Sequence, residues 1–136
     1  MPSEKRIILD TSAILALRSD EAGAEVVEEL LRQAEKTKRP LFASFMTRME
    51  LLYLIWRHEG ELAARRAIGM IDTFNIKWID CESEILDQAA MLKSRGGISV
   101  ADSWIAATAI IRDATLIHKD PELRKIAEIS QQFLEG

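Results

Sequence analysis

The sequence predicts a three-layer α/β/α domain with a central parallel sheet of four or five strands. Short apolar runs typical of buried strands alternate along the chain with longer segments in which apolar residues recur at helical spacing. This alternation favours a parallel sheet with helices on both faces. No internal repeat, low-complexity segment or linker interrupts the pattern, so we expect a single domain over residues 1–136.

The first elements are a strand, two helices and a second strand. Residues 6–10 form an apolar run that ends in an aspartate, which predicts a short buried strand, and a short helix over 11–19 follows. Residues 21–36 carry their apolar side chains on one side, as an amphipathic helix does. Pro40 ends that helix, and we expect the second strand over residues 41–43.

Two adjacent helices and a third strand form the middle of the chain. Residues 44–58 are apolar nearly all round, which predicts a largely buried helix, and Gly60 ends it. A further helix over 61–74 follows closely. Residues 76–79 read as the third strand.

The last part of the chain continues the alternation. We expect a helix over residues 82–93, closed by two glycines, and a helix over 99–112 with a face of small residues. Residues 115–118 form the fourth strand, and Pro121 opens a short helix. Residues 129–134 form either an edge strand or a frayed end.

Composition narrows the functional classes. The chain has 136 residues, of which 48% are apolar, and a net charge of −4. The apolar content argues against disorder, and the acidic balance argues against a broad basic surface for nucleic acid. Cys81 is the only cysteine, which excludes an intramolecular disulfide framework. We therefore expect the protein in the cytoplasm, where a reducing environment keeps thiols free. No apolar run is long enough for a membrane span, and the N-terminus does not resemble a signal peptide.

Four acidic residues stand at positions that suggest a shared site. Asp10 and Asp120 follow predicted strands, at the edge where parallel sheets bind ligands. Asp102 heads the apolar face of its helix, and Glu50 interrupts an apolar run. A buried carboxylate needs a partner, and Mg²⁺ prefers carboxylate oxygens. We therefore predict a magnesium site at which the bound ion holds a phosphodiester and activates water for its hydrolysis.

Helix capping is the alternative explanation for each acid taken singly. Two hydroxyl–acid pairs have the spacing of a capping box: Thr47 with Glu50, and Ser99 with Asp102. Asp120 precedes a proline, as an N-cap residue often does, and Asp10 stands just before a predicted helix. Four independent caps would not explain why two acids follow strands and two interrupt apolar faces.

The four acids lie in four short segments: 7–12 (IILDTS), 43–51 (ASFMTRMEL), 97–109 (GISVADSWIAATA) and 114–120 (ATLIHKD). In this order the segments resemble the PIN-domain family, in particular the VapC-type toxin ribonucleases of type II toxin–antitoxin systems. The third segment is the most specific match, whereas the first is weak by itself. The resemblance covers nearly the whole chain, from Ile7 to about Phe133.

The resemblance implies a PIN-like, magnesium-dependent endoribonuclease in which Mn²⁺ can replace Mg²⁺. The implied catalytic and metal-binding acids are Asp10, Glu50, Asp102 and Asp120, and the supporting hydroxyls are those of Thr11, Ser12 and Ser99. The implied partners are the RNA substrate, a small antitoxin protein and a second copy of the chain in a homodimer. We expect part of the helical pair over residues 44–74 to stay exposed and to bind an amphipathic helix of the antitoxin.

One residue departs from the family pattern. A threonine or serine often stands two residues before the last acid, where this chain has His118. Three alternatives therefore stay open for Asp120: direct contact with the metal, contact only through water, and contact only when substrate is present. Lys93 and Arg95, just before the helix of Asp102, are candidate substrate contacts, and so is His118. A supporting or packing role is the alternative for His118.

Three other functions remain open at this point. The first is an RNA-processing nuclease outside any toxin–antitoxin system, and the second is a non-catalytic RNA-binding or assembly module. The third is a phospho-acceptor domain of flavodoxin-like shape with Asp10 as the acceptor, but it leaves Glu50 unexplained. Magnesium-dependent cleavage of bare RNA would separate nucleases from the other two classes.

Overall fold

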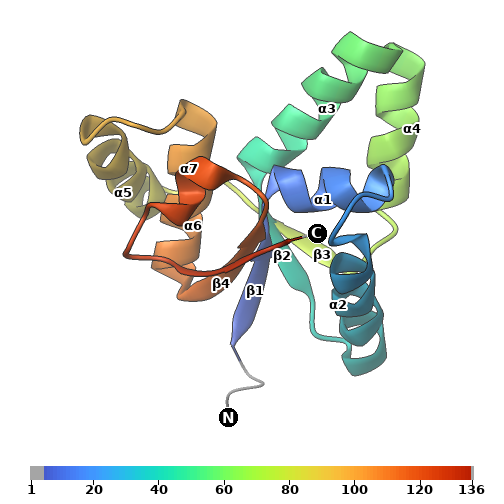
Figure 1. The fold of residues 1–136 in the computed structure, drawn as a ribbon, viewed down its shortest axis with the longest axis horizontal. Coiled ribbons are helices and arrows are strands. Elements are labelled where there is room, and N and C mark those ends of the chain that lie inside the picture. The colour runs from blue at the N-terminus through green and yellow to red at the C-terminus, as the bar shows by residue number, and fades with distance from the viewer. Residues whose placement is uncertain (1–4, 136) are drawn as a thin grey trace.

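A five-stranded parallel sheet forms the centre of the computed structural model, which describes residues 5–135 (Figure 1). The strands are β1 (Arg6–Leu9), β2 (Leu41–Ser44), β3 (Ile76–Ile79), β4 (Ala114–His118) and β5 (Ser130–Phe133). Their order across the sheet is β3-β2-β1-β4-β5, and every neighbouring pair is parallel. The predicted fold class is therefore confirmed, and residues 129–134 contain an edge strand.

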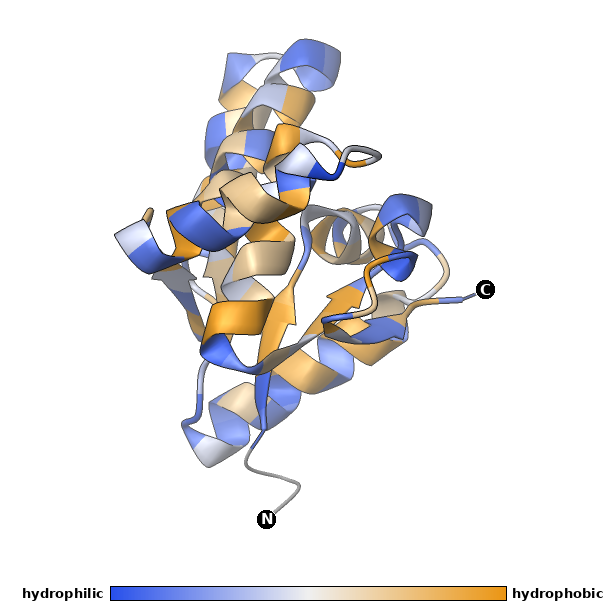
Figure 2. Cartoon of the chain, turned by 90° about the vertical axis from the view of Figure 1, so that its left-hand side faces the viewer, coloured by the Kyte–Doolittle hydropathy of each residue, from blue (hydrophilic) through white to orange (hydrophobic). Residues whose placement is uncertain are grey.

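Helices cover both faces of this sheet. They are α1 (Thr11–Arg18), α2 (Ala24–Thr37), α3 (Phe45–Glu59), α4 (Glu61–Ile71), α5 (Ser83–Ser94), α6 (Val100–Arg112) and α7 (Pro121–Arg124). Alternate strand residues point to opposite faces, so Ile8 packs in a core with α5 and α6, whereas Leu9 packs in a second core with α1 and α2. Figure 2 shows the apolar strands between these helical layers.

The α3–α4 pair extends away from the sheet (Figure 1). The prediction that α3 would be largely buried is wrong: Met49, Tyr53 and Trp56 are 49%, 39% and 43% exposed. α3 packs against α4, α6 and α1, and it forms a small apolar cluster with α4 around Ile55. At its C-terminal end, Glu59 forms an ion pair with Arg18 of α1. The apolar sequence of α3 therefore did not indicate how much of this helix is covered by other elements.

The central position of β1 determines where the site forms. β1 lies between β2 and β4, and Leu9 pairs with Ile117 near the carboxyl ends of the two strands. The Asp10 backbone N–H continues this ladder by donating to the Ile117 carbonyl at 3.0 Å. Side chains that follow β1 and β4 therefore meet at one edge of the sheet. In residues 5–135, no helix combines the length and apolar character needed to cross a bilayer.

Candidate metal centre

Asp10 is buried at the junction of β1 and α1, with an exposed fraction of 3%. Its Oδ2 accepts hydrogen bonds from the Ser12 N–H at 3.0 Å and the Ser12 hydroxyl at 2.5 Å. Its Oδ1 is buried without a hydrogen-bond partner. Burial raises the pKa of this carboxyl, and the charge of Asp120 raises it further, against the lowering effect of the Ser12 hydrogen bonds. Oδ1 is thus a buried acceptor that lacks a donor or cation.

Ser12 connects the ends of β1 and β4. Its hydroxyl donates to Asp10 and accepts the backbone N–H of Lys119 at 2.8 Å. Because one hydroxyl makes both bonds, the Asp10 carboxylate is held against the turn that follows β4. The structure therefore places Ser12 beside a predicted acid, as a supporting hydroxyl would be.

Asp102 and Asp120 come from different elements and lie together. Asp102 is in the first turn of α6 and is 6% exposed, whereas Asp120 precedes α7. One carboxylate oxygen from each of these residues, and one from Glu122, lie within 4.8 Å of one another. Burial, a hydrogen bond with Asp120 and the nearby acidic charges raise the pKa of Asp102 to about 9. Without a cation, the site therefore holds a proton on this pair.

Glu122 was not predicted as a site residue. It lies in the first turn of α7, and its backbone N–H donates to Asp120 Oδ1 at 2.9 Å. The sequence showed Glu122 only as an acid in the first turn of the short helix that Pro121 opens, where acids are common, so no signal singled it out.

Glu50 reaches the site from α3. Its Oε1 accepts a hydrogen bond of 2.6 Å from the Thr11 hydroxyl, which also lies 3.2 Å from the hydroxyl of Thr47. Burial raises the pKa of Glu50, and the charges of Asp10 and Asp120 raise it further, although the Thr11 bond lowers it. Glu50 is outside the closest acidic group but interacts electrostatically with it. Thr11 is thus a second hydroxyl that orients a predicted acid.

Helix capping accounts for part of this arrangement. Asp10 and Asp120 are the N-caps of α1 and α7, and Ser99 caps α6 by accepting the Asp102 N–H at 3.0 Å. The capping box suggested for Glu50 is wrong, because Ser44 is the N-cap of α3 and Glu50 lies within the helix. Capping uses one carboxylate oxygen each of Asp10 and Asp120, and it does not explain why the acids converge.

The predicted substrate contacts lie outside this acidic group. Lys93 Nζ donates to the Ile98 carbonyl at 2.8 Å, and Arg95 forms a 2.5 Å ion pair with Glu128. His118 is fully buried behind Asp120, so its ring is not on the surface where a substrate would bind. The structure therefore corrects the expectation that His118 contacts substrate.

Comparison with known families identifies this arrangement. Residues 7–129 match the family described as the PIN domain. The chain belongs to the PIN domain family. The matched span contains β2, β3 and β4, all of β1 except Arg6, and all the predicted site residues of this PIN domain. No curated protein sequence matches the chain.

Several solved structures share the fold of this PIN domain. VapBC2 from Rickettsia felis, solved with a promoter DNA fragment, has a TM-score of 0.75 and 18% identity, over 95% of this chain and 98% of that one. VapBC-1 from nontypeable Haemophilus influenzae has a TM-score of 0.70 and 23% identity, over 94% and 97%. VapC20 from Mycobacterium tuberculosis, a sarcin–ricin loop cleaving toxin, has a TM-score of 0.68 and 16% identity, over 91% and 97%.

The acids of this PIN domain fit a divalent cation. The raised pKa values of Asp10, Glu50 and Asp102 mean that nearby positive groups do not offset burial and mutual repulsion. Asp10 Oδ1 is a buried acceptor without a donor. Oxygen ligands of this kind suit hard cations such as Mg²⁺, and a bound cation would relieve both the repulsion and the unsatisfied acceptor.

Proposed function

We propose that this PIN domain is a magnesium-dependent endoribonuclease and the toxin of a toxin–antitoxin pair. The observation that carries the proposal is the convergence of Asp102, Asp120 and the unpartnered Asp10 Oδ1 at one edge of the sheet. Carboxylates crowded at one edge of a buried sheet repel one another unless a cation lies between them. The fold shared with a toxin described as cleaving the sarcin–ricin loop supports RNA as the substrate.

Each acid has a distinct part in the proposed reaction. Asp10, Asp102 and Asp120 hold the cation, which when bound polarises the phosphate and activates water. Asp102 releases its proton as the cation binds, because only carboxylate is an effective ligand. Glu50, held by Thr11, orients the attacking water or binds a second ion. Water attacks phosphorus and the bond to the 3′-oxygen breaks, so hydrolysis leaves a 3′-hydroxyl and a 5′-phosphate, and the 2′-hydroxyl takes no part.

A cleavage assay on end-labelled RNA tests the proposal. We expect cutting with Mg²⁺ or Mn²⁺, none with a chelator, and 5′-phosphate ends on the products. Undiminished cleavage in chelator would contradict the metal requirement. RNA binding without cleavage would favour the non-catalytic module instead. Labelling of Asp10 by a small phosphate donor, without cleavage, would favour the phospho-acceptor domain.

We propose that the antitoxin binds a groove of this chain, on the face of the sheet opposite α5 and α6. A cavity of about 440 Å³ opens between α1, α2 and α4. Its apolar lining comes from Ile14, Leu17, Leu31, Ala67, Met70, Ile71 and Phe74, and its charged lining from Arg18, Glu28 and Arg32. An apolar groove with charges of both signs suits an amphipathic helix. Structures of the same fold described as toxin–antitoxin complexes support an antitoxin as the occupant.

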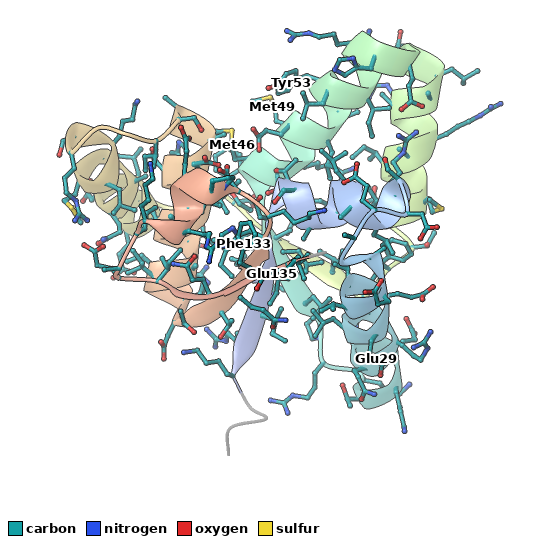
Figure 3. The ribbon with its side chains drawn as sticks, in the orientation of Figure 1. Glu29, Met46, Met49, Tyr53, Phe133 and Glu135 are labelled. Atoms are coloured by element: carbon teal, nitrogen blue, oxygen red, sulfur yellow. The ribbon has the colours of Figure 1, made fainter. Side chains whose placement is uncertain are left out.

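The proposed homodimer has a candidate contact on α3. Met49, Tyr53 and Trp56 follow one another at helical spacing and are all exposed. Figure 3 shows Met49 and Tyr53 on the side of α3 away from α4. An exposed apolar stripe of this kind suits an isologous contact. Light scattering at micromolar concentration should give the mass of two chains, and Trp56→Glu should shift it toward one. A parent protein that stays monomeric would exclude the dimer.

A further inference from the structure

His118 occupies a buried position directly behind Asp120. It is the last residue of β4, is 0% exposed, and pairs in register with Phe133 of β5. The two rings meet edge to face with centroids 5.5 Å apart, and the guanidinium of Arg124, at the end of α7, lies 4.3 Å from the Phe133 ring centroid. Packing of this kind leaves the imidazole little freedom to turn, so its two nitrogens face fixed neighbours.

Both imidazole nitrogens have hydrogen-bond partners. The backbone N–H of Asp120 donates to His118 Nδ1 at 3.1 Å. His118 Nε2 lies 2.7 Å from Gln131 Oε1. The Gln131 amide nitrogen lies 3.1 Å from the Ile126 carbonyl and 3.5 Å from that of Arg124, both in the segment that contains and follows α7.

The donor and the acceptor of each hydrogen bond in this series follow from the groups at its two ends. Backbone carbonyls only accept, so the Gln131 amide nitrogen must donate to them and its Oε1 must face His118. At the other end, the Asp120 N–H only donates, so His118 Nδ1 must accept. A neutral imidazole has one acceptor and one donor nitrogen. The hydrogen is therefore on Nε2, where Gln131 Oε1 accepts it.

We infer that His118 is a positioning residue that holds Asp120 toward Asp102 by accepting the Asp120 N–H at Nδ1, with Gln131 selecting the required tautomer. This inference rests on the cation site of the proposed function. Asp120 Oδ1 already caps α7 through the Glu122 N–H. The imidazole fixes the backbone of the same residue from the other side. With the backbone and one oxygen held, the carboxylate has little freedom to turn away from Asp102.

Two substitutions of His118 separate the two nitrogens. In His118→Asn, the amide oxygen lies about where Nδ1 was, so the bond to Asp120 is kept and the bond to Gln131 is lost. In His118→Gln, the amide nitrogen lies about where Nε2 was, so the bond to Gln131 is kept and the bond to Asp120 is lost. Both variants replace an aromatic ring with a smaller amide, and asparagine, which is one methylene shorter than glutamine, loses more packing against Phe133. Weaker Mg²⁺ binding by His118→Gln than by His118→Asn would therefore not be explained by packing.

The readout is Mg²⁺ binding measured by calorimetry without RNA. Loss of a residue that orients a metal ligand typically weakens metal binding by about 10- to 100-fold. We expect His118→Gln to weaken binding by about tenfold or more, and His118→Asn to stay within about threefold of the parent. Without Mg²⁺, the melting temperature should fall at least as much in His118→Asn as in His118→Gln, because asparagine leaves the larger cavity. Equal loss of Mg²⁺ affinity in the two variants would overturn the positioning role.

A second measurement needs no substitution and no metal. Long-range ¹H–¹⁵N spectra of the metal-free parent report which imidazole nitrogen carries the hydrogen. We expect Nε2–H and an unprotonated Nδ1, with the Asp120 amide resonance shifted as a hydrogen-bonded group. A ring with its hydrogen on Nδ1 would overturn the inference. If the parent shows the expected tautomer and binds Mg²⁺ but does not cut RNA, the proposed function fails while the positioning role stands.

Discussion

Thr11 Oγ1 donates a hydrogen bond of 2.6 Å to Glu50 Oε1, which ties the first residue of α1 to the middle of α3. The bond matters because α3 otherwise extends away from the sheet, and Glu50 is the only predicted site acid on it. The hydroxyl therefore sets how far the carboxylate reaches into the site. Thr11 is itself buried, so water does not readily replace the bond.

Thr11→Val should separate this orienting role from packing. Valine keeps the shape of threonine but removes the donor, so we expect a loss of about 1–2 kcal/mol in the free energy of unfolding. RNA cleavage should fall by about tenfold or more, because Glu50 loses its orientation. Thr11→Ser keeps the hydroxyl and should cut RNA close to the parent rate. Equal cleavage by the valine and serine proteins would remove Thr11 from the site.

Asp10→Asn tests the metal site against simple capping. Asparagine caps a helix about as well as aspartate. If Asp10 only caps α1, the substitution should therefore leave stability and cleavage nearly unchanged. A metal ligand would lose its charge, and RNA cleavage should then disappear. Stability without metal should hold or rise, because burial and the charge of Asp120 disfavour ionised Asp10.

Thermal unfolding measures the same substitution without RNA. Mg²⁺ at about tenfold over its dissociation constant should stabilise the parent by roughly 1.4 kcal/mol. For a chain of this size that corresponds to a rise in melting temperature of about 3–5 °C. Asp10→Asn should lose most of this rise. An unchanged rise together with parental cleavage would show that Asp10 only caps α1.

The raised pKa of Asp102 predicts how stability depends on pH. Folded Asp102 binds its proton more tightly than unfolded Asp102, whose pKa is near 3.8. The contribution of Asp102 to metal-free stability should therefore be complete below that value and decline as pH rises toward about 9. Asp102→Asn should flatten this decline. Stabilisation by Mg²⁺ should increase over the same range, because the cation displaces the proton. Parallel pH profiles for parent and variant would contradict the assignment.

Met70→Glu tests the groove between α1, α2 and α4. Met70 lines the groove and is 53% exposed, so the charge should disturb partner binding more than folding. Leu62→Glu is the matched control, because Leu62 is also on α4, is 63% exposed and does not line the groove. In co-purification with the product of a neighbouring antitoxin gene, only the Met70 variant should lose the complex. Equal retention by both would place the partner elsewhere.

The sequence predicted the sheet well because its signals were local. β1 to β4 are short, mainly apolar runs, whereas β5 is mostly polar, so the sequence left residues 129–134 open between an edge strand and a frayed end. The neighbouring positions of β1 and β4 brought Asp10 and Asp120 to one edge as expected. Asp102 was predicted because a carboxylate at the head of an apolar helix face rarely faces solvent, and it is buried.

The missed features depend on how elements meet in space. Glu122 looked like an ordinary acid in the first turn of a helix, and only the orientation of α7 brings it to Asp102. The exposure of α3 depends on what covers it, which its own apolar residues do not specify. The role of His118 requires Gln131, and the two residues become neighbours only when β5 pairs with β4.

The position of β1 between β2 and β4 also sets an order of events during synthesis. Proteins emerge from the ribosome N-terminal end first, and pairing between segments this distant in the chain is slow because of loop-closure entropy. Asp10 therefore emerges long before Asp102 and Asp120, and a growing chain lacks a complete site until β4 docks beside β1. The residues that line the groove all lie between residues 14 and 74, so they emerge before Asp102 and Asp120. We expect a partner to be able to bind the nascent chain before it acquires nuclease activity.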